Sequence, residues 1–158
     1  TSLYQLSLGT LALCLVQTGS YEEASEAVAK KILNPESFLS VDTRAMAVVA
    51  MTCTYHHTDL GGLRELLQKT LSTVTNGFLD QQERTGGMIG NISSMGLAMQ
   101  ALQVTKEFYA PREWDCAQAF AVVQRHDYQQ PVAIAQVLPI LVGKTYLDVR
   151  SLGRFTST

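Results

Sequence analysis

The sequence is poor in charged residues. Asp, Glu, Lys and Arg make up 16% of its 158 residues, whereas a globular domain ordinarily carries about 25%. Hydrophobic residues make up 46%, which is enough to build one real core in a chain of this length. So few charges leave an excess of apolar surface that a partner, or the rest of a larger unit, must cover. We favour the second explanation.

Three other features are missing from the sequence, and each bears on the kind of protein it can be. The basic residues are scattered and the net charge is −2, which argues against a nucleic acid or an anionic membrane surface as a partner. No run of about 18 apolar residues occurs, so we expect no membrane insertion. The first residues show neither the basic start nor the cleavage site of a signal peptide. A signal removed further upstream remains compatible with this sequence.

The sequence does contain helical patterns from end to end. Some segments are apolar on nearly all faces, which predicts helices buried on two sides; these are residues 3–17, 42–57, 92–105 and 131–142. The segments between them place their polar residues on one side only; these are residues 20–33, 60–74 and 112–126. Buried helices alternating with half-exposed ones are typical of an all-α fold, the α/α toroid, in which an outer ring wraps an inner ring.

The spacing of equivalent positions indicates how much of a ring is present. Cys14 and Cys53 occupy similar places in buried segments 39 residues apart, and the polar heads at Asp42, Asn91 and Pro131 follow at intervals of 49 and 40 residues. Four inner and three outer helices are therefore predicted. A closed ring takes about six hairpins, so we expect this chain to form about half of one.

Polar residues gather at the starts of the predicted inner helices. Because these helices run parallel, their starts should meet at one mouth, where a ligand would find side chains and helix-start amides together. The residues are Thr1, Tyr4, Asp42, Thr43, Asn91, Ser93 and Ser94, with Gln136 just over one turn into the last inner helix. A local explanation for Asp42 and Thr43 stays open, because Asp and Thr are both good helix N-caps.

Five stretches together resemble the vitamin B12 carriers of animals, the family of gastric intrinsic factor, transcobalamin and haptocorrin. They are "TSLYQLSLGTLALC", "SVDTRAMAVVAMTC", "IGNISSMGLAMQAL", "EWDC" and "IAQVLPILVGKTYLDV". Each stretch alone is a weak signal, but five in order along nearly the whole chain are specific. Features of all three carriers are mixed among them, so the resemblance extends to the family and not to one member.

The resemblance implies a fold and a function. Residues 1–158 would be the C-terminal half of a cobalamin-binding α-domain, an α6/α6 barrel, which the family follows with a small β-domain that closes over the corrinoid. The protein would be a secreted, non-catalytic carrier of cobalamin that meets a cell-surface uptake receptor. By match to the family motifs, the residues that hydrogen-bond the ligand would be Thr1, Tyr4, Asp42, Asn91 and Gln136.

One position departs from the family pattern. The transcobalamin-like pattern has a histidine three residues before the "VDT" aspartate, where it can take the upper position on cobalt, and this chain has Leu39 there. A leucine cannot replace imidazole as a metal ligand. We therefore expect bound cobalamin to keep water, or its own ligand, on the upper face.

The three cysteines also match family positions. The resemblance implies a disulfide between Cys14 and Cys53, and it leaves Cys116 of "EWDC" without its partner, which lies in a family segment absent from this sequence. From the residues alone, three inert buried thiols in a cytosolic protein remain the alternative.

The remaining candidates support other roles less well. His56 and His57 end a predicted inner helix. There they are expected to interact with the negative C-terminal end of the helix and not to bind a metal ion. The glycine-rich stretch at residues 84–91 predicts a tight turn or a short hairpin that leads to Asn91. The glycosylation sequon at 91–93 is expected to be unused because a glycan would block the mouth. An α/α-toroid enzyme remains the alternative function, but Asp42 is the one acid on the predicted inner helices, and paired carboxylates would have to come from elsewhere.

Overall fold

In a computed structural model of the chain, residues 2–125 are described, and their regular structure is entirely helical. The helices are α1 (Leu3–Val16), α2 (Tyr21–Leu33), α3 (Val41–His57), α4 (Gly61–Thr85), α5 (Ile92–Gln103), α6 (Lys106–Tyr109) and α7 (Cys116–Arg125). Within that part of the chain, no helix combines the length and the apolar character that a bilayer crossing requires. The predicted inner helix at 131–142 lies outside the described residues.

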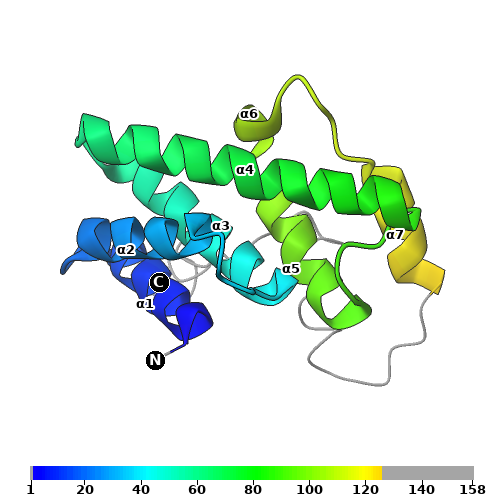
Figure 1. The fold of residues 1–158 in the computed structure, drawn as a ribbon, viewed down its shortest axis with the longest axis horizontal. Helices are drawn as coiled ribbons and strands as arrows, with labels where there is room; N and C mark the ends of the chain where they lie inside the picture. The colour runs from blue at the N-terminus through cyan, green and yellow to red at the C-terminus, as the bar shows by residue number, and fades with distance from the viewer. Residues whose placement is uncertain (1, 126–158) are drawn as a thin grey trace, which may run out of the picture.

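The helices form the two layers that the periodicity predicts. Helix α3 packs against α1 on one side and α5 on the other, and α2 and α4 pack against α3 and against each other. Helices α1, α3 and α5 run in the same general direction, and their first turns lie along one edge of the molecule (Figure 1). The outer helices α2 and α4 return the chain from the far ends of the inner helices towards this edge (Figure 1). The starts of the inner helices are thereby brought together, as the sequence predicts.

The centre of the core is α3. Its residues from Ala45 to Thr54 are all buried, and the small side chains of Ala45, Ala47 and Ala50 let neighbouring helices approach closely. Hydroxyls within this helix are satisfied locally or by a neighbour: the Thr52 hydroxyl donates to Val48 O at 2.7 Å. The prediction of a helix buried on two sides is correct for α3 and for α5, which buries nine of its twelve residues.

For α1 the same prediction is wrong in this structure. Only Ser7, Thr10, Leu11 and Cys14 are buried. The opposite face is apolar but open, with Leu8 47%, Leu13 37% and Val16 65% exposed. The reason is that α1 has α3 and α2 on one side and no described element against the other.

The boundaries of α4 and α7 also differ from prediction. Helix α4 continues to Thr85 instead of ending near residue 74, and α7 begins at Cys116 instead of residue 112. The segment between them is attached to α4 by side chains: Gln82 Nε2 donates to Asp115 O at 3.0 Å, and Gln82 Oε1 accepts from Asp115 N. Arg112 forms ion pairs with Asp80 and Glu83, which both belong to the extended part of α4.

Candidate ligand-binding site

Helices α1 and α3 are aligned by the disulfide between Cys14 and Cys53, whose Cα atoms are 6.3 Å apart. Eleven residues before Cys53 stands Asp42, and eleven before Cys14 stands Leu3. At 1.5 Å per residue both lie about 16 Å from the disulfide along their helices. Since the two helices run the same way (Figure 1), Tyr4 and Asp42 stand at the same level at the edge where the inner helices begin.

Asp42 is not the N-cap of α3. Ser40 has that role: its backbone is extended, and its hydroxyl accepts the N–H of Thr43 at 3.2 Å and contacts the Thr43 hydroxyl at 3.0 Å. Local capping therefore does not explain why an aspartate stands at the head of this apolar helix. Thr43 does contribute to the cap, but through its hydroxyl and amide as partners of Ser40.

One oxygen of the Asp42 carboxylate instead makes no hydrogen bond within the described residues. This atom, Oδ1, is buried. Burial raises the pKa of this carboxyl above its ordinary value, because water is withdrawn from the charged form and no hydrogen bond replaces it. A buried acceptor without a donor is uncommon in native proteins and calls for an explanation.

Two other buried polar atoms without a partner belong to the beginnings of the same helices. Four such atoms occur in the described residues: those of Asp42 and Arg44 are in the first turn of α3, that of Ser7 is in the second turn of α1, and that of Gln103 is at the end of α5. The Ser7 side chain is fully buried. Arg44 sits over the ring of Phe78, 5.8 Å from its centroid. Three of the four unpaired atoms thus belong to the first two turns of inner helices.

Asn91 caps α5 and remains exposed. Its Oδ1 accepts the N–H of Ser94 at 3.0 Å, while the Ser94 hydroxyl accepts the N–H of Asn91 at 3.0 Å, which completes a capping box. The acceptor half of this amide is therefore engaged, and its NH₂ group is the part that is left to donate to a ligand.

The turn before Asn91 depends on a glycine. Gly90 has φ +71°, and a Cβ there would lie 2.3 Å from the Ser94 hydroxyl and 3.0 Å from Val41 Cβ. Any side chain would push α5 away from the start of α3. Of the tight turn and the short hairpin that the sequence left open here, the structure has a turn, which follows the end of α4 at Thr85. This turn brings the first turns of α3 and α5 together.

Tyr4 lies half-buried in the first turn of α1 and packs against the core. The N-cap of this helix is Ser2, whose hydroxyl accepts the N–H of Gln5 at 3.1 Å. Tyr4, Asp42 and Asn91 are therefore all within the first turn or at the cap of three adjacent parallel helices. Thr1 and Gln136, the other two predicted ligand residues, lie outside the described residues.

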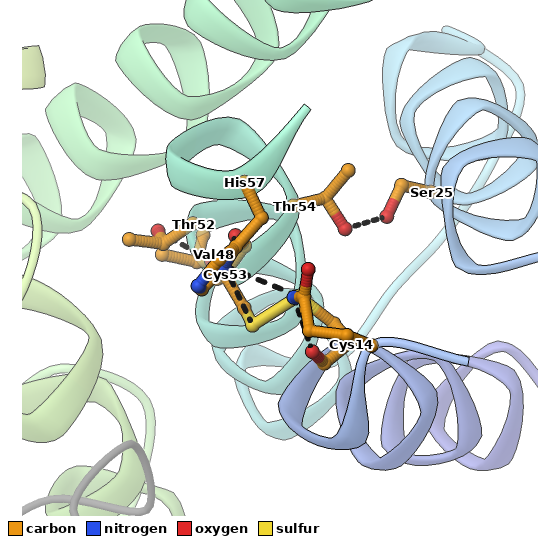
Figure 2. Close-up of a disulfide and its surroundings, with 8 residues drawn as sticks. Cys14, Ser25, Val48, Thr52, Cys53, Thr54 and His57 are labelled. Carbon is orange, nitrogen blue, oxygen red and sulfur yellow. Dashed lines mark hydrogen bonds between the residues drawn. A yellow bond between two sulfur atoms is a disulfide. The ribbon is translucent and has the colours of Figure 1, made fainter. Parts of the chain in front are cut away.

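The predicted disulfide between Cys14 and Cys53 is present, and Cys116 is free and exposed. Figure 2 shows that the bond joins α1 to α3 one turn before His57. His57 Nδ1 lies 2.8 Å from Cys53 O and within 3.8 Å of both sulfur atoms. The three side chains are close enough to share a metal ion, but the two sulfurs are bonded to each other and are not free as thiolate ligands.

A cavity of about 660 Å³ lies away from this edge. It is formed by the end of α5, by α6 and by the start of α7, and its wall includes Gln103, Tyr109, Trp114, Cys116 and Phe120. Gln103 and Asn91 are at opposite ends of α5, about 18 Å apart along the helix. Tyr4, Asp42 and Asn91, the predicted ligand residues that the structure describes, thus belong to the edge where the inner helices begin and are not part of the wall of this cavity.

The chain as a whole was compared with known proteins, and it matches a family model and several curated relatives. The family model described as "Eukaryotic cobalamin-binding protein" matches residues 1–153. Rat cobalamin binding intrinsic factor is 37% identical over 156 residues, which cover 94% of this chain and 37% of that protein. Human transcobalamin-1 is 39% identical over 165 residues, with the same coverage of 94% and 37%.

A solved structure supports the same relationship. The crystal structure of haptocorrin in complex with Cbi superposes on this chain with a TM-score of 0.81 at 33% sequence identity, covering 94% of this chain and 40% of the other. Human transcobalamin-2 is 34% identical over 158 residues. The chain spans 36 to 37% of the length of these curated relatives.

Proposed function

We propose that this chain, which belongs to the family of eukaryotic cobalamin-binding proteins, forms one wall of a site that holds cobalamin for transport. The observation that carries the proposal is the buried Oδ1 of Asp42, which has no hydrogen-bond partner at the edge where the inner helices begin. A corrinoid is fringed with amide side chains, and their N–H groups are suitable donors to this oxygen. Tyr4 and the NH₂ group of Asn91 stand along the same edge, and Thr1 and Gln136 complete the set that we propose.

The proposed role is binding without catalysis. Among the described inner helices α1, α3 and α5, Asp42 is the one acidic side chain, so an acid and base pair of the kind used in glycoside hydrolysis is not formed there. The hydrogen bonds that we propose need only fixed donors and acceptors. The alternative, a toroid enzyme, finds no specific support in the described residues.

We further propose that the 158 residues are the C-terminal half of a cobalamin-binding α-domain. Two observations support this: the chain spans 36 to 37% of its relatives' length, and α1 presents an open apolar face. Further helices packed on that face would continue the ring, and a closing domain would cover the ligand. Enclosure of this kind is what tight binding of a large ligand needs.

Secretion and a cell-surface uptake receptor are part of the same proposal. The Cys14–Cys53 disulfide supports secretion, because such bonds persist in oxidising compartments. We propose no nucleic-acid partner, in line with the net charge of −2 and the scattered basic residues.

The test uses the full-length protein and hydroxocobalamin. Wild type should bind, with a change in the visible spectrum. Asp42→Asn should release the ligand roughly 5 to 150 times faster, because a charged acceptor is lost and an unpaired donor is gained, a change of about 1 to 3 kcal/mol. Asp59→Asn is the matched control, since Asp59 is exposed just beyond the other end of α3. Equal release rates for the two variants would remove Asp42 from the site, and absence of binding by wild type would refute the proposed function.

A further inference from the structure

The connection between α2 and α3 exposes a phenylalanine completely. Phe38 has 103% of its reference surface open to solvent. The other large apolar residues that are exposed lie between 37% and 65%; they are Leu8, Leu13 and Val16 on α1, and Leu60 at the start of α4. Single apolar residues on a surface are ordinary, so exposure alone assigns no role to Phe38. Its position does.

The connection is structured at both ends, so Phe38 is held outward. Asn34 Oδ1 accepts the N–H of Glu36 at 3.0 Å, and Asn34 O accepts the N–H of Ser37 at 3.1 Å. Two residues after Phe38, Ser40 caps α3 through its bond to Thr43. A turn on one side and a helix cap on the other leave little freedom for the ring to fold back onto the protein.

The same connection runs along the edge where α3 and α5 begin (Figure 1). Phe38 stands four residues before Asp42, whose buried Oδ1 has no partner among residues 2–125, and Leu39 between Phe38 and the cap is partly buried. An exposed aromatic ring and a partly buried aspartate are therefore four residues apart where the chain enters α3. They offer an apolar contact and a hydrogen-bond acceptor to whatever covers this edge.

We propose that Phe38 packs its ring against the corrin macrocycle of the bound ligand, as a positioning contact beside the hydrogen bond to Asp42. This inference rests on the proposed function and adds to it the part of the ligand that each residue recognises. A corrin is a broad conjugated ring with amides at its fringe, so an acceptor suits the fringe and an aromatic side chain suits the ring itself. The other large apolar side chains that are exposed in the described part of the chain stand further from Asp42 in sequence, on α1 and at the start of α4.

The experiment measures ligand release from the full-length protein. Phe38→Ala should release hydroxocobalamin about ten times faster than wild type, which corresponds to about 1.4 kcal/mol, and Phe38→Leu should fall between the two. Leu60→Ala is the control, because Leu60 is also exposed but follows the opposite end of α3. Release from Leu60→Ala should match wild type.

Two further measurements identify what Phe38 touches. Cobinamide has the corrin ring but lacks the nucleotide, so its release should be accelerated by the same factor; acceleration restricted to hydroxocobalamin would overturn a contact with the ring. The unfolding temperature of the ligand-free protein should be the same for Phe38→Ala and wild type. A lower temperature for the variant would show that another part of the protein covers Phe38, and would also overturn the inference.

The outcome separates this inference from the proposed function. If wild type binds hydroxocobalamin and Asp42→Asn releases it faster while Phe38→Ala releases it at the wild-type rate, the proposed function stands and the role of Phe38 is refuted. If wild type does not bind, the proposed function itself is refuted.

Discussion

The hydroxyl of Ser40 accepts the backbone N–H of Thr43 at 3.2 Å, and this bond closes the first turn of α3 without any contribution from Asp42. The two residues are close in sequence and have separate uses. Ser40 satisfies an amide that the helix cannot pair internally, while one Asp42 oxygen is buried and finds no partner within residues 2–125. We therefore expect that the stability of this helix start and the proposed ligand contact can be changed independently.

Ser40→Ala should lower the free energy of unfolding by about 1 kcal/mol, the ordinary cost of losing a side-chain N-cap. Cobalamin release from the full-length protein should stay unchanged, because the Ser40 hydroxyl is occupied by α3. Denaturant unfolding and release kinetics measure the two effects. Ser40→Asn should restore stability, because asparagine caps as well as serine; failure of this rescue would show that Ser40 does something other than capping.

The pH dependence of stability should reveal the burial of Asp42. Its pKa is raised above 3.8 by burial, so the folded protein holds this proton more tightly than the unfolded chain does. The contribution of Asp42 to stability is therefore greatest below pH 3.8 and is lost as the pH rises towards the raised pKa. The difference in unfolding free energy between wild type and Asp42→Asn, measured as a function of pH, isolates this contribution. A difference with no slope just above pH 3.8 would show that the carboxyl is solvated.

Ligand binding should depend on pH in the opposite sense. The proposed hydrogen bonds need the ionised carboxylate as acceptor, so release of cobalamin should become faster as the pH falls through the raised pKa of Asp42. Release from Asp42→Asn should lack this component. The measurement is the release rate of both proteins between neutral and acidic pH, and parallel profiles for the two would contradict the role given to Asp42.

Removal of the disulfide should destabilise the 158-residue chain strongly. Replacing Cys14 and Cys53 by serine opens a 39-residue loop, for which the chain-entropy estimate is about 3 to 4 kcal/mol. Cys116→Ser should change stability little, because that thiol is free and exposed. Urea unfolding tests both variants, and peptide mapping without reduction tests the pairing: a peptide that joined Cys116 to either of the others would contradict it.

A charge on the open face of α1 should distinguish a half ring from a complete fold. If further helices cover Leu8 in the full-length protein, Leu8→Glu should destabilise it by about 3 kcal/mol, the cost of an uncompensated buried charge. Ala27→Glu is the control, because Ala27 is exposed on the outer helix α2. Equal, small effects of both substitutions on the unfolding temperature would show that the face of α1 is open to water in the full-length protein.

Parts of the fold followed from periodicity, and the failures have physical causes. The buried helix α3 was predictable because its apolar residues continue over four turns. The end of α4 was not, because Asn76 and Gly77 are a typical turn signal. In the structure the chain passes through them as helix, since Phe78, Leu79 and Gln82 in the next turns are buried, and this burial outweighs the local preference of two residues.

The candidate site was predictable as a location and less so in its detail. The parallel inner helices place Tyr4, Asp42 and Asn91 on one edge, as their spacing indicates. Which residue caps α3 could not be decided beforehand, because Ser40, Asp42 and Thr43 are all favourable caps. The backbone decided it: Ser40 has the extended conformation that a cap requires, and Asp42 is already inside the helix.

Features that depend on neighbours along the chain could be predicted from the sequence: the helical periods, the alternation of inner and outer helices, and the cysteines of equivalent position. Which polar atoms are paired and which apolar residues are covered became known only from the tertiary structure. In the part of the chain that the structure describes, the Asp42 oxygen is buried without a partner and Phe38 is fully exposed, although both lie in the same short stretch. Burial and pairing are set by what distant segments place against a side chain, and no local pattern contains that information.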